Sequence, residues 1–350
     1  MRLRFLLATI LIILLSLSSV SAQVTDISIG KGSLKLGGIL QAGYTWHAED
    51  KEGFDSFTIN RARFLMWGEI IPDQVTYFVQ LETKSDVSLL DYKAALNYIP
   101  KTKLIIGRFL PNLTLYMPSS TAKLEMINYP LTTSRFAPWR QIGIQSVTKT
   151  EFAEFTLGIL NGADQPNNTA DNNDAKDFLF RADFIPPIEW ATVRCGGYAW
   201  IGRARPEFND ETGDSLIIFP EETLKNNMFG GFIKLDYDGP VPIRFRGEYI
   251  ASTAEHLTDG NIGSIDETKR MAYLGHLGIR VHPTVEILAR YDAYDPDTDI
   301  DNNIESWLTG GLNYYIEGGN AMVYLNYIHK MEEGTDIEND LVLGQIQITF

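Results

Sequence analysis

The chain has 350 residues, of which 44% are hydrophobic, and its 45 acidic and 30 basic side chains give a formal net charge of −15. This acidic balance argues against nucleic acid as a partner, because binding to a phosphate backbone needs excess positive charge. The single cysteine, Cys195, excludes an internal disulfide framework.

Residues 1–22 have the features of a signal peptide. Two arginines lie within the first four residues, Phe5 to Leu17 are apolar, and Val20-Ser21-Ala22 form a small-residue cleavage site. The apolar stretch is too short to favour a membrane span, and no later run approaches the roughly 18 apolar residues of a transmembrane helix. We therefore expect an exported chain in which residues 23–33 form a short periplasmic segment.

From Leu34 onward, apolar and polar residues alternate with period two. The stretch 178–184 is typical, since Phe178, Phe180 and Phe184 lie on one face and Arg181 and Asp183 on the other. Such alternation predicts strands whose two faces meet different surroundings. We expect about sixteen strands, at residues 34–46, 57–70, 75–84, 90–98, 103–110, 140–147, 152–160, 178–184, 191–199, 229–237, 243–251, 270–281, 285–292, 308–316, 321–327 and 341–350.

Short turns and longer loops join these strands in strict alternation. Strands of about 9 to 11 residues match the hydrocarbon thickness of a membrane, and an even number of them can close into a barrel without edges. The sequence therefore predicts an all-β fold, a transmembrane antiparallel β-barrel over residues 34–350, closed by pairing of the last strand with the first. A barrel of this size is wide enough for an aqueous channel.

Residues 111–139 form the longest stretch without alternation. They are too apolar for disorder, with leucines, methionines and tyrosines throughout. Long loops in compact folds are usually functional. We expect this segment to fold into the lumen and to form a constriction there.

Acidic residues concentrate in the expected loops. Six loop segments carry a summed charge of about −22, which leaves the remaining chain basic. They are residues 47–55, 161–176, 203–225, 255–268, 292–305 and 330–340. The sequence thus places acid on the rim and base in the wall.

Several motifs resemble the phosphate-selective porin O and P family of bacterial outer membranes. The most specific are Ile59-Asn60-Arg61-Ala62-Arg63-Phe64 and the run 290–299, which leads to Gly311-Leu312-Asn313-Tyr314-Tyr315; Ile106-Gly107-Arg108-Phe109 and residues 138–143 are also similar. The resemblance implies a homotrimer of 16-stranded barrels among outer-membrane lipid and lipopolysaccharide, conducting small inorganic anions such as phosphate. It also implies that the third extracellular loop shapes the narrow point, and that the terminal Phe350 is a signal for barrel assembly. Here the polar faces mix bases with acids, which leaves phosphate specificity open.

Arginines on the polar faces are the candidate site residues. Paired guanidinium groups suit phosphate and carboxylate because each donates two parallel hydrogen bonds. The candidates for lining the channel are Arg61, Arg63, Arg181, Arg194, Arg244, Arg246, Arg280 and Arg290, and those for the constriction are Lys123, Arg135 and Arg140. The alternative is that these arginines pair with glutamates on neighbouring strands and only brace the wall. Removing the charge of Arg61, Arg63 and Arg135 together tests the first interpretation, which predicts a lower anion preference.

The sequence predicts neither a metal site nor a cofactor. Asp295, Asp297, Asp299 and Asp301 alternate like a calcium loop, but Ile300 occupies the position where an EF-hand needs glycine. The five histidines are scattered and no hydrolase motif is present, so we expect no enzyme. Two alternatives to an anion porin stay open: a non-selective or cation-preferring general porin, and a non-conducting surface barrel for binding or adhesion.

Overall fold

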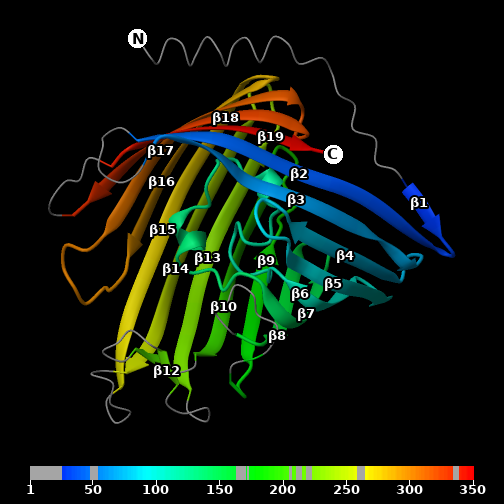
Figure 1. Cartoon of the computed structure of the whole chain (residues 1–350), viewed down its shortest axis with the longest axis horizontal. Helices are drawn as coiled ribbons and strands as arrows, with labels where there is room; N and C mark the ends of the chain where they lie inside the picture. Colours follow the sequence, from blue (N-terminus) through cyan, green and yellow to red (C-terminus); the bar gives the residue numbers. More distant parts are fainter. Residues whose placement is uncertain are drawn as a thin grey trace.

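The computed structural model describes residues 26–47, 54–162, 171, 173–204, 207–209, 215–217, 223–257, 265–333 and 339–350. The expected signal peptide and parts of the long loops lie outside these residues. Within the described ranges the regular secondary structure is almost entirely β-strand (Figure 1).

Sixteen antiparallel strands form one closed ring. Each pairs with the next along the chain, β9 pairs with β10, β10 with β13, and β19 returns to β2. The expected all-β antiparallel barrel of sixteen strands is therefore confirmed. The ring consists of β2 (Gly32–His47), β3 (Ser56–Ile71), β4 (Val75–Glu82), β5 (Ser88–Ile99), β6 (Thr102–Phe109), β7 (Gln141–Lys149), β8 (Ala153–Leu160), β9 (Asp177–Phe184), β10 (Thr192–Ala204), β13 (Leu224–Tyr237), β14 (Ile243–Leu257), β15 (Ile265–His282), β16 (Val285–Asp295), β17 (Glu305–Glu317), β18 (Ala321–Glu332) and β19 (Leu341–Thr349).

Three short strands of the described residues lie outside this ring. β1 (Asp26–Ile29) forms a hairpin with the start of β2, and β11 (Glu207–Asn209) pairs with β12 (Ser215–Ile217). Part of the expected periplasmic segment 23–33 is therefore a strand, β1, which pairs with the first residues of β2.

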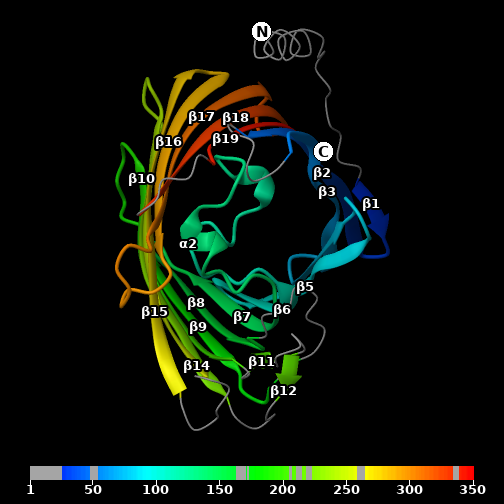
Figure 2. The ribbon, with the colours of Figure 1, turned by 60° about the vertical axis from the view of Figure 1, so that its left-hand side comes forward.

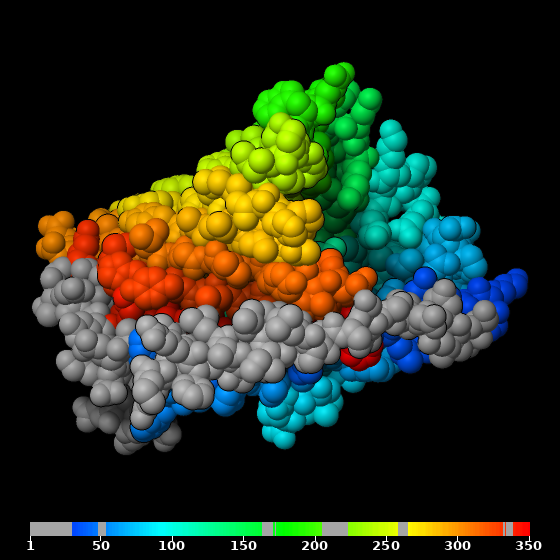
Figure 3. All heavy atoms as spheres, turned by 90° about the horizontal axis from the view of Figure 1, so that it is seen from above, coloured from blue at the N-terminus to red at the C-terminus, as the bar shows by residue number. Residues whose placement is uncertain are grey.

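The period of two along each strand separates an outer from an inner face. On β9, Phe178, Phe180 and Phe184 are about half exposed on the outside, whereas Arg181 and Asp183 are buried on the inside. Apolar side chains on the outer face follow from a lipid environment, where a charge at mid-bilayer costs about 2–4 kcal/mol. Figure 3 shows the strands from β13 to β19 side by side across one outer face.

Strand lengths differ around the barrel. β4, β6, β8 and β9 have eight residues each, while β13 to β18 have 11 to 18. Most of the long strands run several residues past their expected ends at the long-loop side. Outside the hydrocarbon, backbone pairing continues without an apolar outer face, so alternation no longer marks the boundary.

The seam between β19 and β2 ends on the terminal aromatic residue. Gly38 donates its N–H to the Phe350 carbonyl at 2.9 Å and accepts the Phe350 N–H at 3.2 Å. A Cβ at Gly38 would collide with the Phe350 ring, so glycine lets this ring approach β2 closely.

Residues 110–140, between β6 and β7, form the 110–140 segment. It contains a single 3₁₀ turn, η1 (Thr121–Lys123), and the short helix α2 (Leu131–Ser134). Figure 2 draws α2 and its flanking chain within the ring of strands. Among the described residues, no helix is long and apolar enough to cross a membrane.

Candidate functional site

The 110–140 segment contacts inner-face side chains on both sides of the barrel, and its largest apolar cluster lies on one of them. Leu113, Met117 and Phe136 are buried against inner-face residues of β8 to β10 and β13 to β15. These partners are Leu160, Leu179, Tyr198, Trp200, Met228, Phe232, Ile250 and Ala272. Side chains therefore fill this part of the interior.

One buried carboxylate binds the segment to the barrel wall at two places, Leu115 and Thr132. Glu248 of β14 accepts the Leu115 N–H at 2.6 Å and the Thr132 hydroxyl at 2.7 Å. It also accepts the Tyr198 hydroxyl at 2.9 Å. Since charged acceptors make the stronger hydrogen bonds, this residue is a principal attachment of the segment.

Two of the arginines expected to line the channel also hold the segment. Arg181 donates to the carbonyls of Leu113 and Thr114 at 2.9 and 2.7 Å, and Arg290 donates to the Asn128 carbonyl at 3.1 Å. Each pairs with the aspartate two residues later on its own strand, at 2.7 and 2.6 Å. Both arginines are almost fully buried. Their guanidinium groups therefore stabilise the segment and are not available to bind solutes.

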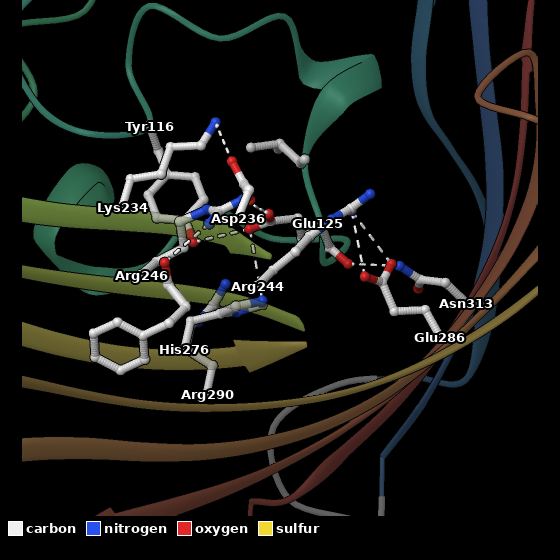
Figure 4. A network of polar contacts seen from close by, with 12 residues as sticks. Tyr116, Glu125, Lys234, Asp236, Arg244, Arg246, His276, Glu286, Arg290 and Asn313 are labelled. Carbon is white, nitrogen blue, oxygen red and sulfur yellow. Dashed lines mark hydrogen bonds and ion pairs between the residues drawn. The ribbon is translucent and has the colours of Figure 1, made fainter. Parts of the chain in front are cut away.

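Arg246 lies at the centre of a charged network around the segment (Figure 4). It pairs with Glu125 of the segment at 2.7 Å and with Asp236 of β13 at 2.6 Å. His276 of β15 lies 3.6 Å from the same Glu125. The positive charge of Arg246 is thus matched by two carboxylates.

Arg244 and Arg280 share a third carboxylate. Glu286 lies 3.3 Å from Arg244 and 3.7 Å from Arg280, and the Tyr315 hydroxyl donates to it. Arg280 also covers the Tyr315 ring at 3.9 Å from its centroid. This pairing is the bracing arrangement that was the alternative to anion binding.

The opposite wall, formed by β2 to β5, presents Arg61 and Arg63. Arg61 donates to the Gln41 side chain at 2.7 Å, whereas Arg63 pairs with Glu82 at 3.1 Å and donates to the Thr121 hydroxyl at 2.9 Å. The two guanidinium groups project to the same side, as the sequence predicts for residues two apart on a strand.

Arg140, at the end of the segment, adds a third guanidinium to this wall. It pairs with Asp91 of β5 at 3.0 Å. Tyr129 of the segment lies nearby and packs edge-on against Trp139, with 5.4 Å between ring centroids. Burial raises the pKa of the Tyr129 phenol, so this residue is uncharged near neutral pH.

A cavity of about 1140 Å³ lies against β2 to β6, toward the short-turn end of the barrel. Its charged lining side chains are Glu69 and four lysines, namely Lys35, Lys93, Lys103 and Lys123. Within the described residues, Lys93, Lys103 and Lys123 have no carboxylate at ion-pair distance. The cavity is therefore a basic part of the interior.

The sequence predicts a site role for Lys123 but not for Lys35, Lys93 or Lys103. All three occupy inner-face positions of their strands. The period of two predicts this for Lys35 and Lys93, but it leaves the phase of residues 103–110 open, because Arg108 shares a face with Leu104 and Ile106. Their convergence depends on the pairing of β2 to β6, in which Lys35 faces Trp67 and Lys93 faces Phe78.

Two further candidates lie apart from this cavity. Arg135 is partly exposed toward the long-loop end and pairs with Glu305 at 2.6 Å. Arg194 pairs with Asp183 at 2.8 Å. The structure thus distributes the predicted residues over several separate ion pairs.

No group of three or more histidine, cysteine, aspartate or glutamate side chains in the described ranges is arranged to hold a metal ion. In the acidic run after β16, the Asp297 and Asp299 amides donate to the carboxylates two residues earlier, at 3.0 and 3.1 Å. The aspartates therefore cap local turns.

Comparison with models of known protein families and with curated protein sequences gives no match. Solved structures give clear likenesses. The outer membrane channel DcaP of Acinetobacter baumannii is 11% identical with a TM-score of 0.67, and covers 94% of this chain and 100% of its own. An anion-selective porin from Comamonas acidovorans is 13% identical with a TM-score of 0.61, and covers 91% and 100%.

The trimer form of OmpT, an outer membrane protein of Vibrio cholerae, is a third likeness. It is 11% identical with a TM-score of 0.62, and covers 91% of this chain and 99% of its own. At these identities the likenesses show the fold, which is that of bacterial outer-membrane porins.

Proposed function

We propose that the protein is an outer-membrane porin through which small anions diffuse along the β2 to β6 side of the barrel. The observation that carries this proposal is the basic cavity, whose lining has four lysines and one glutamate. Arg61, Arg63 and Arg140 continue the basic surface beside it, against Glu82 and Asp91. Positive charge in a low-dielectric channel concentrates anions and repels cations.

The path takes this side because the buried apolar contacts of the 110–140 segment lie against β8 to β10, β13 to β15 and β17 to β19. In this proposal the segment is the third extracellular loop and forms the constriction, as the resemblance to phosphate-selective porins implies. Phosphate is one of the expected solutes, because that resemblance implies it. The likeness to OmpT in its trimer form supports a homotrimer in the outer membrane.

The test is the zero-current potential of the purified protein in a planar bilayer under a potassium chloride gradient. We expect the anion-selective sign, and a shift toward zero in the variant Lys93→Gln/Lys103→Gln/Lys123→Gln. Lys101→Gln is the matched control, because Lys101 is an exposed lysine in the β5–β6 turn and does not line the cavity. A cation-selective potential in the unmodified protein contradicts the proposal.

A general porin without anion preference is the second candidate. It is favoured by the pairing of Arg244, Arg246 and Arg290 with carboxylates, which leaves that wall with little net charge. A potential near zero, unaffected by the lysine substitutions, supports this reading. Absence of any conductance favours a non-conducting binding barrel.

A further inference from the structure

The basic cavity has an apolar strip along its wall. Its members are inner-face residues of β2 to β6: Ile39, Leu65, Trp67, Phe78, Ala95 and Ile105. The strand register makes them neighbours, since Trp67 faces Phe78 and Ala95 faces Ile105 across adjacent strands. Ile39 and Ala95 are buried, whereas Leu65, Trp67, Phe78 and Ile105 are only partly buried. Apolar surface left in water forgoes about 25 cal/mol per Å² of burial, so these four residues favour a solute with an apolar part.

The lysines border the strip at close range. The Lys93 ammonium lies 5.1 Å from the centroid of the Phe78 ring, and Lys35 is the register partner of Trp67. Lys103 lies two residues before Ile105 on the inner face of β6. A lysine and an aromatic ring are therefore neighbours at two places in the cavity wall.

We propose that this cavity binds organic anions with a flat apolar body, of which aromatic monocarboxylates are the simplest. The ring would lie on the strip beside Trp67 and Phe78, and the carboxylate would reach the ammonium of Lys93 or Lys103. Rings of this kind gain from offset or edge-on contact with aromatic side chains, and ammonium groups attract carboxylates. The inference rests on the proposed function and names the solute class for the same path.

Inorganic phosphate and acetate are the contrasting solutes. Each offers the negative charge without a ring, so it can use the lysines and not the strip. The selectivity for benzoate over acetate therefore isolates the contribution of the apolar wall.

The experiment measures block of chloride current by benzoate, acetate and phosphate in the bilayer. We expect benzoate to reach half-block at a concentration about tenfold lower than acetate, and phosphate to show no such advantage. Trp67→Thr/Phe78→Thr removes both rings with a residue that suits strands, and should bring the benzoate-to-acetate ratio close to one. Ile105→Thr is a milder change in case the double variant does not fold, and should lower the ratio severalfold.

Two controls separate the apolar wall from charge and from the outer surface. Lys103→Gln should weaken block by benzoate and acetate alike, so their ratio stays. Ile144→Thr makes the Ile105→Thr change on the outer face of β7, where Ile144 is 47% exposed, and should leave the ratio unchanged. Equal block by benzoate and acetate in the unmodified protein, or a ratio that survives loss of both rings, overturns the inference.

Calorimetric titration of the detergent-solubilised protein with benzoate and acetate makes the result independent of conductance. An anion-selective channel with equal binding of the two solutes refutes the aromatic site and leaves the anion porin standing. A channel without anion preference that still binds benzoate more tightly refutes the anion porin and supports the site.

Discussion

Arg63 and Arg61 carry the same charge two residues apart, but they differ in what neutralises it. Arg63 pairs with the largely buried Glu82, whereas Arg61 donates to the neutral Gln41 side chain. A paired arginine contributes little net potential to the channel, and its carboxylate contributes once the arginine is gone.

Arg63→Gln should therefore move the zero-current potential toward the cation side, by unmasking Glu82. Arg63→Gln/Glu82→Gln removes both charges and should return the potential close to that of the unmodified protein. Arg61→Gln should move the zero-current potential toward the cation side, because it removes one positive charge that no ion pair balances in the described residues. If the double variant shifts as far as Arg63→Gln alone, ion pairing does not decide what these arginines present to solutes.

For a single residue, the sequence predicts which face of its strand the side chain takes, but it predicts little about the partners of that side chain. Arg181 and Arg290 lie on inner faces, where alternation puts them, because alternation depends only on neighbours along the chain. Their attachment to Leu113 and Asn128 joins residues 68 and 162 positions apart, which no local pattern encodes.

Among the larger elements, the 110–140 segment depends on Glu248 for two of its hydrogen bonds to the wall. Glu248→Ala removes these and the bond from Tyr198, each worth about 1.5–3 kcal/mol for a charged acceptor. We expect larger and noisier single-channel currents, and a lower denaturant midpoint. Glu255→Ala is the control on the same strand, since Glu255 pairs with the exposed Lys225 at 2.8 Å.

Unchanged conductance in Glu248→Ala, equal to that of the control, would mean that the segment does not limit the passage. A lower denaturant midpoint alone would then assign Glu248 a purely structural role.

The strands themselves were predictable, all sixteen of them, from turns and alternation. Their outer ends were not, as β15 shows by beginning at Ile265 where alternation predicts 270. Residues beyond the hydrocarbon obey backbone pairing alone. The segment was identified by its lack of alternation, while its path follows from side chains on β9, β14, β16 and β18 that only the closed ring brings together.

Across the whole molecule, charge is distributed unequally between the two ends of the barrel. The basic cavity lies near the short turns, beside Asn320 and Lys103. Exposed carboxylates such as Glu267, Asp299 and Asp301 lie at the end that carries the long connections.

A pore with fixed positive charge at one mouth and negative charge at the other conducts like an ionic diode. Current should be larger when the long-connection side is positive, because anions then enter past the lysines while cations enter past the carboxylates. The asymmetry should be evident at about 0.1 M salt, where screening extends over roughly 10 Å, and fade near 1 M, where it extends over roughly 3 Å. Current–voltage curves of single oriented channels measure it, and symmetric curves at low salt would show that the two mouths do not act on permeating ions separately.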